Sequence, residues 1–297
     1  MNFYYISYAL NLAALYMIAG IGSSFSIKSG DLNIGGEGQI YIGGFVCAVI
    51  LNYLKNLPSI FALFMAIFCS MLVPGILMLF CALLKKIKGA VILLTSYIVS
   101  AAIIPLVDGL IAGPFRGNSN NLLSTEYINE KFRFISILKP GPLNISFFIA
   151  IIFCILAGLV IYKSSYGRQL CIYGISEEYS KFSSFNTTRL SFSSAFASGA
   201  FHGLCGAFAI CGTYYTCHNG FYISMGWNAL TCALIARSNP FLLFPTSLFM
   251  SFMVTYANRY ALYHNFSFDM SSLIQSLFLL LIAFPIFSEG KKRITSK

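Results

Sequence analysis

The chain has 297 residues, of which 58% are hydrophobic and 16% aromatic, whereas only 9% are charged. Because soluble domains carry about 25% charged residues, this composition excludes an ordinary water-soluble fold and predicts an integral membrane protein. The net charge of +10 is compatible with nucleic-acid binding, but the cations occur in short clusters between apolar stretches. We therefore expect membrane lipid, and no nucleic acid, among its partners.

Long apolar stretches recur along the chain, and a helix needs about 20 such residues to cross the hydrocarbon core. In chain order they predict helices near 4–25, 33–54, 58–84, 89–112, 143–163, 190–214, 240–262 and 268–288. A shorter segment, 226–237, is predicted to be a half-helix or a re-entrant segment. The fold class expected is all-α, a polytopic bundle of about eight or nine helices that forms one transmembrane domain over 1–297.

The distribution of Lys and Arg predicts an orientation. With the N-terminus outside and 226–237 counted as a crossing, 13 of the 19 cations lie on the cytoplasmic side and 6 on the outer side. This bias follows the positive-inside rule, so we expect a cytoplasmic C-terminus. A re-entrant 226–237 would move the basic cluster 291–293 to the other side. The first cation is Lys28, so the first helix lacks the charged start of a signal peptide and is expected to stay.

A glycine-rich motif, GDLNIGGEGQ at 30–39, leads into the second apolar stretch. Glycines permit irregular backbone and close helix contacts, which a bilayer tolerates only against protein or a water-filled cavity. The motif is therefore expected to face the interior of the bundle. An acid within a membrane is a functional candidate by default, and Glu37 is the clearest case. The alternative is that Glu37 is paired or capped near the interface and holds the helix entrance in place.

Two long polar segments, 113–142 and 164–190, are predicted on opposite sides of the membrane. The outer segment 113–142 has charged residues at spacings compatible with a short surface helix, and is either a connector or a docking site for an external partner. In the inner segment 164–190, Ser176 is a good N-cap for a short amphipathic helix. Its faces would carry aromatic and charged residues, namely Tyr179, Phe182 and Phe185 beside Glu177, Glu178 and Lys181. Such a helix either lies at the lipid interface or fills a groove on a partner.

A third unusual stretch surrounds the only tryptophan, Trp227. It contains the amide Asn228 and an early break at Asn239 and Pro240. This combination is typical of the broken helices that line transport pathways, and an interfacial Trp anchor is the alternative interpretation.

Soluble catalytic motifs are not found in the sequence. It contains no G-x-x-x-x-G-K-[ST], H-E-x-x-H or G-x-S-x-G, so the chain is not expected to be an enzyme or to hydrolyse ATP. The nine cysteines form no C-x-x-C pair and are expected to be small buried hydrophobes. The three histidines lack a ligand partner at i+3 or i+4, so no metal or bound cofactor is expected.

Taken in order, the three motifs resemble those of permease subunits of bacterial ABC importers for nucleosides and simple sugars, a group that includes branched-chain amino acid permeases. The run 33–38 keeps the N-I-G-x-E-G core of the first signature, although an earlier glutamate of that signature is Ile27 here. Gly174 opens the second signature, in which Tyr179-Ser180 stand in place of two alanines and Ser184-Phe185 in place of Gly-Ile, and the match is close again over 198–207. The stretch 226–240 is similar to the third. The likeness extends over nearly the whole chain.

This resemblance implies a bacterial inner-membrane importer in which two permease subunits enclose the pathway. The second subunit is expected to be a homologous but different chain. An ATPase subunit would use the ATP, and an external substrate-binding protein or lipoprotein would deliver a nucleoside, ribose or galactose. In the family the loop corresponding to 164–190 forms the coupling helix that contacts the ATPase. Coupling is thereby assigned to Gly174, Glu177, Glu178, Tyr179, Lys181, Phe182 and Phe185. The pathway is assigned to Asn33, Gly35, Glu37, Gly38, Gln39, Trp227, Asn228 and Asn239.

Two other classes of protein compete with this interpretation. A secondary transporter driven by an ion gradient would use intramembrane acids, for which Glu37, Asp108 and Asp269 are the candidates. An intramembrane enzyme would need paired catalytic residues, which the sequence lacks.

Overall fold

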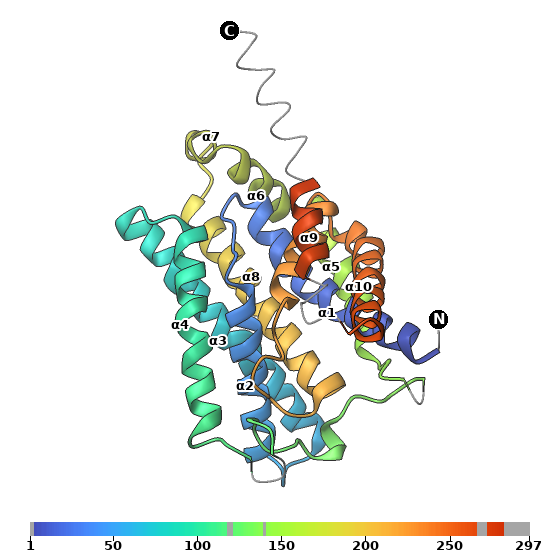
Figure 1. Ribbon diagram of the computed structural model, residues 1–297. Coiled ribbons are helices and arrows are strands. Elements are labelled where there is room, and N and C mark those ends of the chain that lie inside the picture. Colours follow the sequence, from blue (N-terminus) through green and yellow to red (C-terminus); the bar gives the residue numbers. More distant parts are fainter. Residues whose placement is uncertain (1–2, 118–120, 139–140, 266–271, 282–297) are drawn as a thin grey trace.

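A computed structural model describes residues 3–117, 121–138, 141–265 and 272–281. Within these ranges the regular structure is helical, apart from two isolated β-bridges, which confirms the all-α expectation. Ten α-helices follow one another in Figure 1: α1 (Phe3–Lys28), α2 (Gly36–Tyr53), α3 (Ser59–Lys88), α4 (Ile92–Ala112), α5 (Ser146–Lys163), α6 (Ser165–Ile175), α7 (Glu177–Phe182), α8 (Thr187–Ala209), α9 (Met225–Ile235) and α10 (Pro240–Tyr263). A π-helical turn, Ile210–Tyr214, extends α8, and a further helix covers Ser272–Leu281.

Six of the described helices are long and apolar enough to cross a membrane, namely α1, α3, α4, α5, α8 with its π-helical extension, and α10. The 18-residue α2 has Gly, Glu and Gln in its first turn, which lower its hydropathy. The 11-residue α9 agrees with the half-helix predicted over 226–237. Of the span predicted at 268–288, only Ser272–Leu281 is described as a helix, and the rest lies outside the described residues.

Several helix boundaries differ from those predicted by three or four residues, and three of them lie at glycines, namely the start of α2, the end of α3 and the start of α4. Residues 31–35 are not helical, so α2 begins at Gly36 rather than at 33. Helix α3 continues to Lys88 and ends at Gly89, whose φ of 68° is left-handed, so α4 begins only at Ile92. A left-handed glycine is a common helix C-terminus because no Cβ opposes that conformation.

Helices α1 and α8 form the centre of the bundle. In their most apolar windows 89% and 83% of the residues are buried, compared with 28% in α4, which lies at the edge in Figure 1. The central helices cross their neighbours at glycines. A methyl group at Gly203 in α8 would overlap the carbonyl oxygen of Ser70 in α3, and one at Gly206 would overlap that of Ile40 in α2. Backbone contact at small residues is how helices associate in lipid, where no hydrophobic force drives them together.

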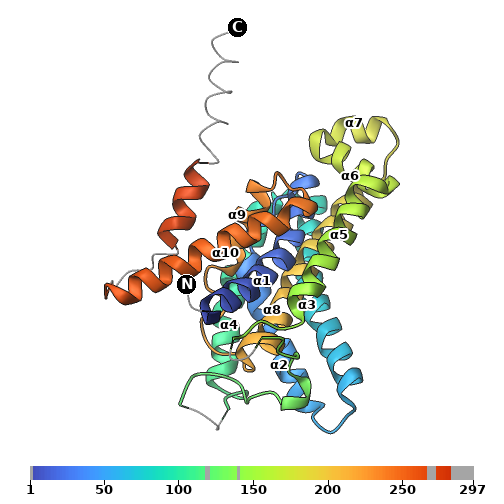
Figure 2. The same ribbon diagram turned by 90° about the vertical axis from the view of Figure 1, so that its right-hand side faces the viewer.

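The two long polar segments lie at opposite ends of the bundle. Figure 2 shows α6 and α7 projecting from one end, whereas the connection between α4 and α5 passes along the other. In that connection the described residues contain one 3₁₀ turn, Glu130–Phe132, in place of the short surface helix expected there. Phe132 of this turn is buried and anchors the connection to the bundle.

Candidate pathway and coupling site

The turn between α1 and α2, residues 29–35, is held by one buried amide. Asn33 is 1% exposed. Its Nδ2 donates to Oε1 of Gln39 and to Oγ of Ser198, both at 2.9 Å, and its Oδ1 accepts the N–H of Gly35 at 2.9 Å. These bonds satisfy buried polar groups of a non-helical turn. The structure thus brings together Asn33, Gly35 and Gln39, three of the residues predicted to shape the pathway.

Glu37 joins the start of α2 to the start of α9. Its Oε1 accepts the N–H of Ser224 at 2.8 Å, directly before α9. The two helix starts are in close contact, because a methyl group at Gly226 would lie 2.6 Å from the N of Glu37. A carboxylate is favourable where two helix N-termini meet, since both present partial positive charge. Glu37 thus holds a helix start in place, which is the second of the two roles considered for it from the sequence.

The other predicted pathway residues occupy separate places. The N–H of Gly38 donates to Oγ of Ser100 in α4 at 2.8 Å, so the glycine permits close contact between α2 and α4. Asn228 is buried and donates to the hydroxyl of Tyr16 at 2.9 Å, whereas Trp227 is half-buried. Asn239 lies beyond the opposite end of α9 and caps α10 by accepting the N–H of Phe241 at 3.1 Å. Asn239 therefore lies apart from the cluster around Asn33.

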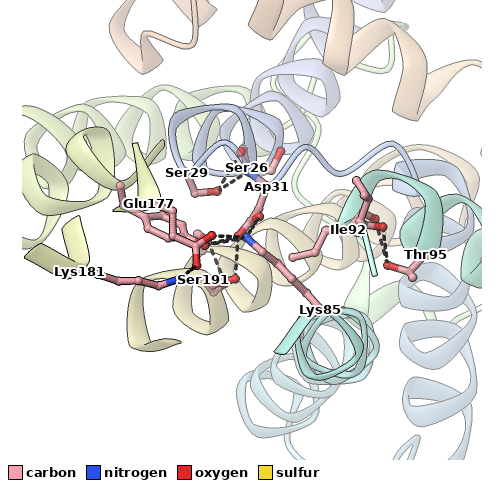
Figure 3. Close-up of polar contacts among 12 residues, drawn as sticks. Ser26, Ser29, Asp31, Lys85, Ile92, Thr95, Glu177, Lys181 and Ser191 are labelled. Carbon is pink, nitrogen blue, oxygen red and sulfur yellow. Dashed lines mark hydrogen bonds and ion pairs between the residues drawn. The ribbon is translucent and has the colours of Figure 1, made fainter. Parts of the chain in front are cut away.

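Figure 3 shows an ionic network formed by Asp31, Lys85, Glu177 and Lys181, with Ser191 as a neutral member. The hydroxyl of Tyr173 is a second neutral member. Asp31 is 7% exposed, and its Oδ1 lies 2.7 Å from Nζ of Lys85. Its Oδ2 accepts the hydroxyl of Ser191 at 2.6 Å and that of Tyr173 at 3.2 Å. One carboxylate of the 29–35 turn is thus bound to α3, α6 and α8.

Lys85 also reaches the first residue of α7. Its Nζ lies 3.4 Å from Oε2 of Glu177, whose Oε1 is 2.8 Å from Nζ of Lys181. The hydrogen bond from Lys181 and the charge of Lys85 hold the pKa of Glu177 below its ordinary value, and partial burial opposes them. Glu177 is therefore charged at neutral pH. Lys85 is shared between an acid of the 29–35 turn and an acid of α7.

The N-cap predicted for α7 is confirmed, because Oγ of Ser176 accepts the N–H of Tyr179 at 3.2 Å. The predicted aromatic stripe is divided, since α7 ends at Phe182 and the chain turns through a left-handed Ser184. Tyr179 and Phe182 are 58% and 90% exposed, while Phe185 lies beyond the helix and packs against the core.

Gly174 places the end of α6 directly against the end of α1. A methyl group on Gly174 would overlap the carbonyl oxygen of Lys28, and Gly30 faces it with a left-handed φ of 72°. This close contact requires glycine at both positions. The α6–α7 segment is consequently seated on the same turn that carries Asp31 and Asn33.

Asp31 and Lys85 are not among the residues predicted from the sequence, because the two members of this pair lie far apart in the chain. Two features of the sequence could have indicated this pair. Asp31 stands two positions before Asn33, and Lys85 belongs to the lysine cluster that ends α3. Among the described residues, no group of three or more His, Cys, Asp or Glu side chains is placed to hold a metal ion. The arrangement is suited to transmit displacement of α7 through Lys85 to the start of α2.

Comparison with known proteins gives consistent matches over most of the chain. Residues 5–283 match the family described as branched-chain amino acid transport system, permease component. The chain is 30% identical to a probable riboflavin import permease protein of Treponema pallidum, over 94% of this chain and 74% of the relative. It is 22% identical to a guanosine ABC transporter permease protein of Bacillus subtilis, over 78% and 67% of the two chains. No solved structure matches it significantly.

Proposed function

Because the chain belongs to the permease component family of branched-chain amino acid transport systems and is an ABC importer permease, we propose that its solute is a nucleoside or a chemically similar compound. Such a compound joins a heteroaromatic ring to a ribose or an open polyhydroxylated chain. The permease family of ABC importers implies an ATPase subunit and an external substrate-binding protein as partners. A second, homologous permease subunit completes the proposed pathway.

The printed names of the two relatives support this class of solute. Guanosine and riboflavin both combine a polar heteroaromatic ring with a five-carbon polyhydroxylated group, although they differ in ring size. The half-buried Trp227 lies beside Asn228, whose buried Oδ1 has no hydrogen-bond partner among the described residues. The partly exposed ring of Trp227 suits a solute of this chemistry, because heteroaromatic rings stack on such a surface.

The ionic network supports a role for α7 as the element that contacts the ATPase. Tyr179 and Phe182 leave an aromatic surface open to a partner, and short helices with exposed aromatic residues commonly dock in grooves. The opposite side of α7 holds Lys85 through Glu177. Motion of the ATPase would therefore reach Asp31 and the start of α2. This Lys85 contact is the observation that carries the proposed coupling.

The proposed orientation places α6 and α7 in the cytoplasm and the N-terminus outside. Helices α1, α3 and α5 all carry Lys in their last turn, and these ends meet the α6–α7 segment. A concentration of cations at one end of the bundle fits a cytoplasmic position under the positive-inside rule.

The solute is tested with the permease, its ATPase and its binding protein reconstituted in proteoliposomes. Uptake of labelled guanosine and riboflavin should require ATP and saturate for at least one of them, and excess free ribose or galactose should not compete. Effective competition by a free sugar would overturn the proposed solute class. ATP-independent uptake that collapses with the proton gradient would instead support a secondary transporter.

Coupling is tested by charge reversal at the two adjacent acids of α7. Glu177→Lys places a cation against Lys85 and Lys181, so ATP hydrolysis should continue while uptake falls. Glu178, which the resemblance also assigned to coupling, lies outside this network, because it is exposed and forms no ion pair among the described residues, so Glu178→Lys is the matched comparison. Equal coupling in wild type and Glu177→Lys would contradict this role.

A further inference from the structure

A cation near the C-terminal end of α10 stacks on an aromatic ring. The guanidinium carbon of Arg259 lies 4.6 Å from the ring centroid of Tyr5 at the start of α1. Within the part of the chain that the structure describes, no acid forms an ion pair with it. Stacking on a ring face leaves the N–H groups at the guanidinium edge available to an anion.

Arg259 lines a groove together with three tyrosines. This tyrosine groove is formed by Tyr256, Arg259, Tyr260 and Tyr263, which share one face of α10 because they are three or four residues apart. Tyr256 and Tyr263 are 61% and 83% exposed. The groove thus combines one positive charge, several hydrogen-bond donors and flat apolar walls.

The groove lies at the end of a membrane-spanning helix. Helix α10 is long and apolar enough to cross the bilayer, and its last two turns contain the tyrosines. Tyrosine is enriched where membrane meets water, which is also the depth of lipid phosphates. Arginine is suited to phosphate because its planar fork donates two parallel hydrogen bonds.

We propose that the tyrosine groove binds the phosphodiester headgroup of a membrane phospholipid. Arg259 binds the phosphate oxygens, the hydroxyls of Tyr256 and Tyr263 add donors, and their rings pack along the first part of the acyl chains. Because Arg259 also contacts Tyr5, the bound lipid links the start of α1 to the end of α10. This site is separate from the 29–35 turn and from α7, and it does not depend on the identity of the solute.

The test is native mass spectrometry of the full chain with its ATPase, purified and then supplied with defined lipid. The two probes are a phosphatidylglycerol and an uncharged diacylglycerol with the same acyl chains. Phosphatidylglycerol should be retained, and Arg259→Gln should reduce its apparent affinity about tenfold, which corresponds to the loss of a charge-assisted contact. Diacylglycerol should be retained weakly and equally by both proteins.

Arg133→Gln is the matched control. Arg133 also stacks on a tyrosine, with its guanidinium carbon 4.7 Å from the ring centroid of Tyr215, but it is paired with Glu130 at 3.3 Å. Its replacement should leave lipid retention unchanged. If Arg259→Gln yields no folded protein, Arg259→Lys keeps the charge without the fork and should show an intermediate affinity.

Three results would overturn the proposal. They are equal retention by wild type and the Arg259 variant, equal loss in the Arg133 and Arg259 variants, and diacylglycerol binding as tight as that of phosphatidylglycerol. Addition of inorganic phosphate distinguishes a free anion from a lipid. Displacement of the lipid by millimolar phosphate would be a fourth contrary result, because it would show that the groove binds the anion alone.

Discussion

The interior around α8 and the α6–α7 end of the molecule are held together in opposite ways. Along α8 the backbones of three helices touch at glycines, so almost no side chain separates them. At the α6–α7 end, the six-residue helix α7 is attached through its N-cap Ser176 and through the ion pair between Glu177 and Lys85. The first arrangement resists sliding because every shift creates overlap. The second rests on a few contacts and can be displaced, as an element that transmits motion must be.

The comparison predicts its largest effect at Gly203, where a side chain has no space. Gly203→Ala should destabilise the fold by about 3 kcal/mol, because overpacking a backbone contact forces two helices apart. Gly109→Ala in α4 is the control, since a methyl group there meets nothing within 4 Å, and alanine favours a helix by about 1 kcal/mol. Thermal unfolding followed by size-exclusion chromatography measures both. A similar loss in both variants would contradict the importance of the glycine crossing.

An intermediate effect is expected when Lys85 is removed. Lys85→Gln leaves the buried Asp31 without its cation, at a cost of about 2 kcal/mol in the free energy of unfolding. Asp31→Asn should reduce this penalty, so a double-mutant cycle should show favourable coupling of about 1 kcal/mol or more. Additive effects of the two substitutions would show that the pair contributes nothing beyond its separate contacts.

A smaller effect is expected at Glu177, which is more exposed. Glu177→Gln should increase hydrogen exchange in the backbone of α7 by about twofold, because weakly buried ion pairs contribute little. Glu178→Gln should leave exchange unchanged. Exchange in α8 should be the same in both variants, and a change there would show that the two regions are not mechanically distinct.

The smallest effect is the response of α7 to pH. Because the folded pKa of Glu177 is lowered, its stabilising contribution is complete above the ordinary carboxyl pKa of about 4.3 and disappears as the pH falls through the lowered value. Exchange protection of α7 should therefore be constant from about pH 8 to pH 5, after correction for the intrinsic exchange rate. A loss of protection near pH 6 would indicate that another group controls the docking of α7.

The sequence was sufficient to predict structural features that depend on residues close together in the chain. Long apolar stretches predicted the helices, and Ser176 followed by two acids predicted the start of α7. The glycines of the motif at 30–39 indicated that irregular backbone was permitted there, but the predicted helix began at 33, whereas the structure keeps 31–35 non-helical around Asn33.

Features that depend on how distant segments meet could not be predicted. Asp31 and Lys85 lie 54 positions apart, and neither residue type is unusual at a helix end. Glycine is required at 174 because the end of α6 lies against the carbonyl oxygen of Lys28 at the end of α1. A contact between two distant helix ends is not visible in the local sequence. Asp269, a candidate for a secondary transporter, lies outside the described residues, whereas Asp108 accepts hydrogen bonds from Tyr41 at 2.5 Å and Asn219 at 3.0 Å.

In the proposed mechanism, α7 transmits the motion of an ATPase to the interior through Lys85. The direct test is the number of ATP molecules hydrolysed per solute imported, measured in proteoliposomes that contain the complete importer. Lys85→Gln should raise this ratio several-fold, while Lys86→Gln, at an exposed neighbouring lysine, should match wild type. An unchanged ratio in Lys85→Gln, with normal assembly of the complex, would contradict the account.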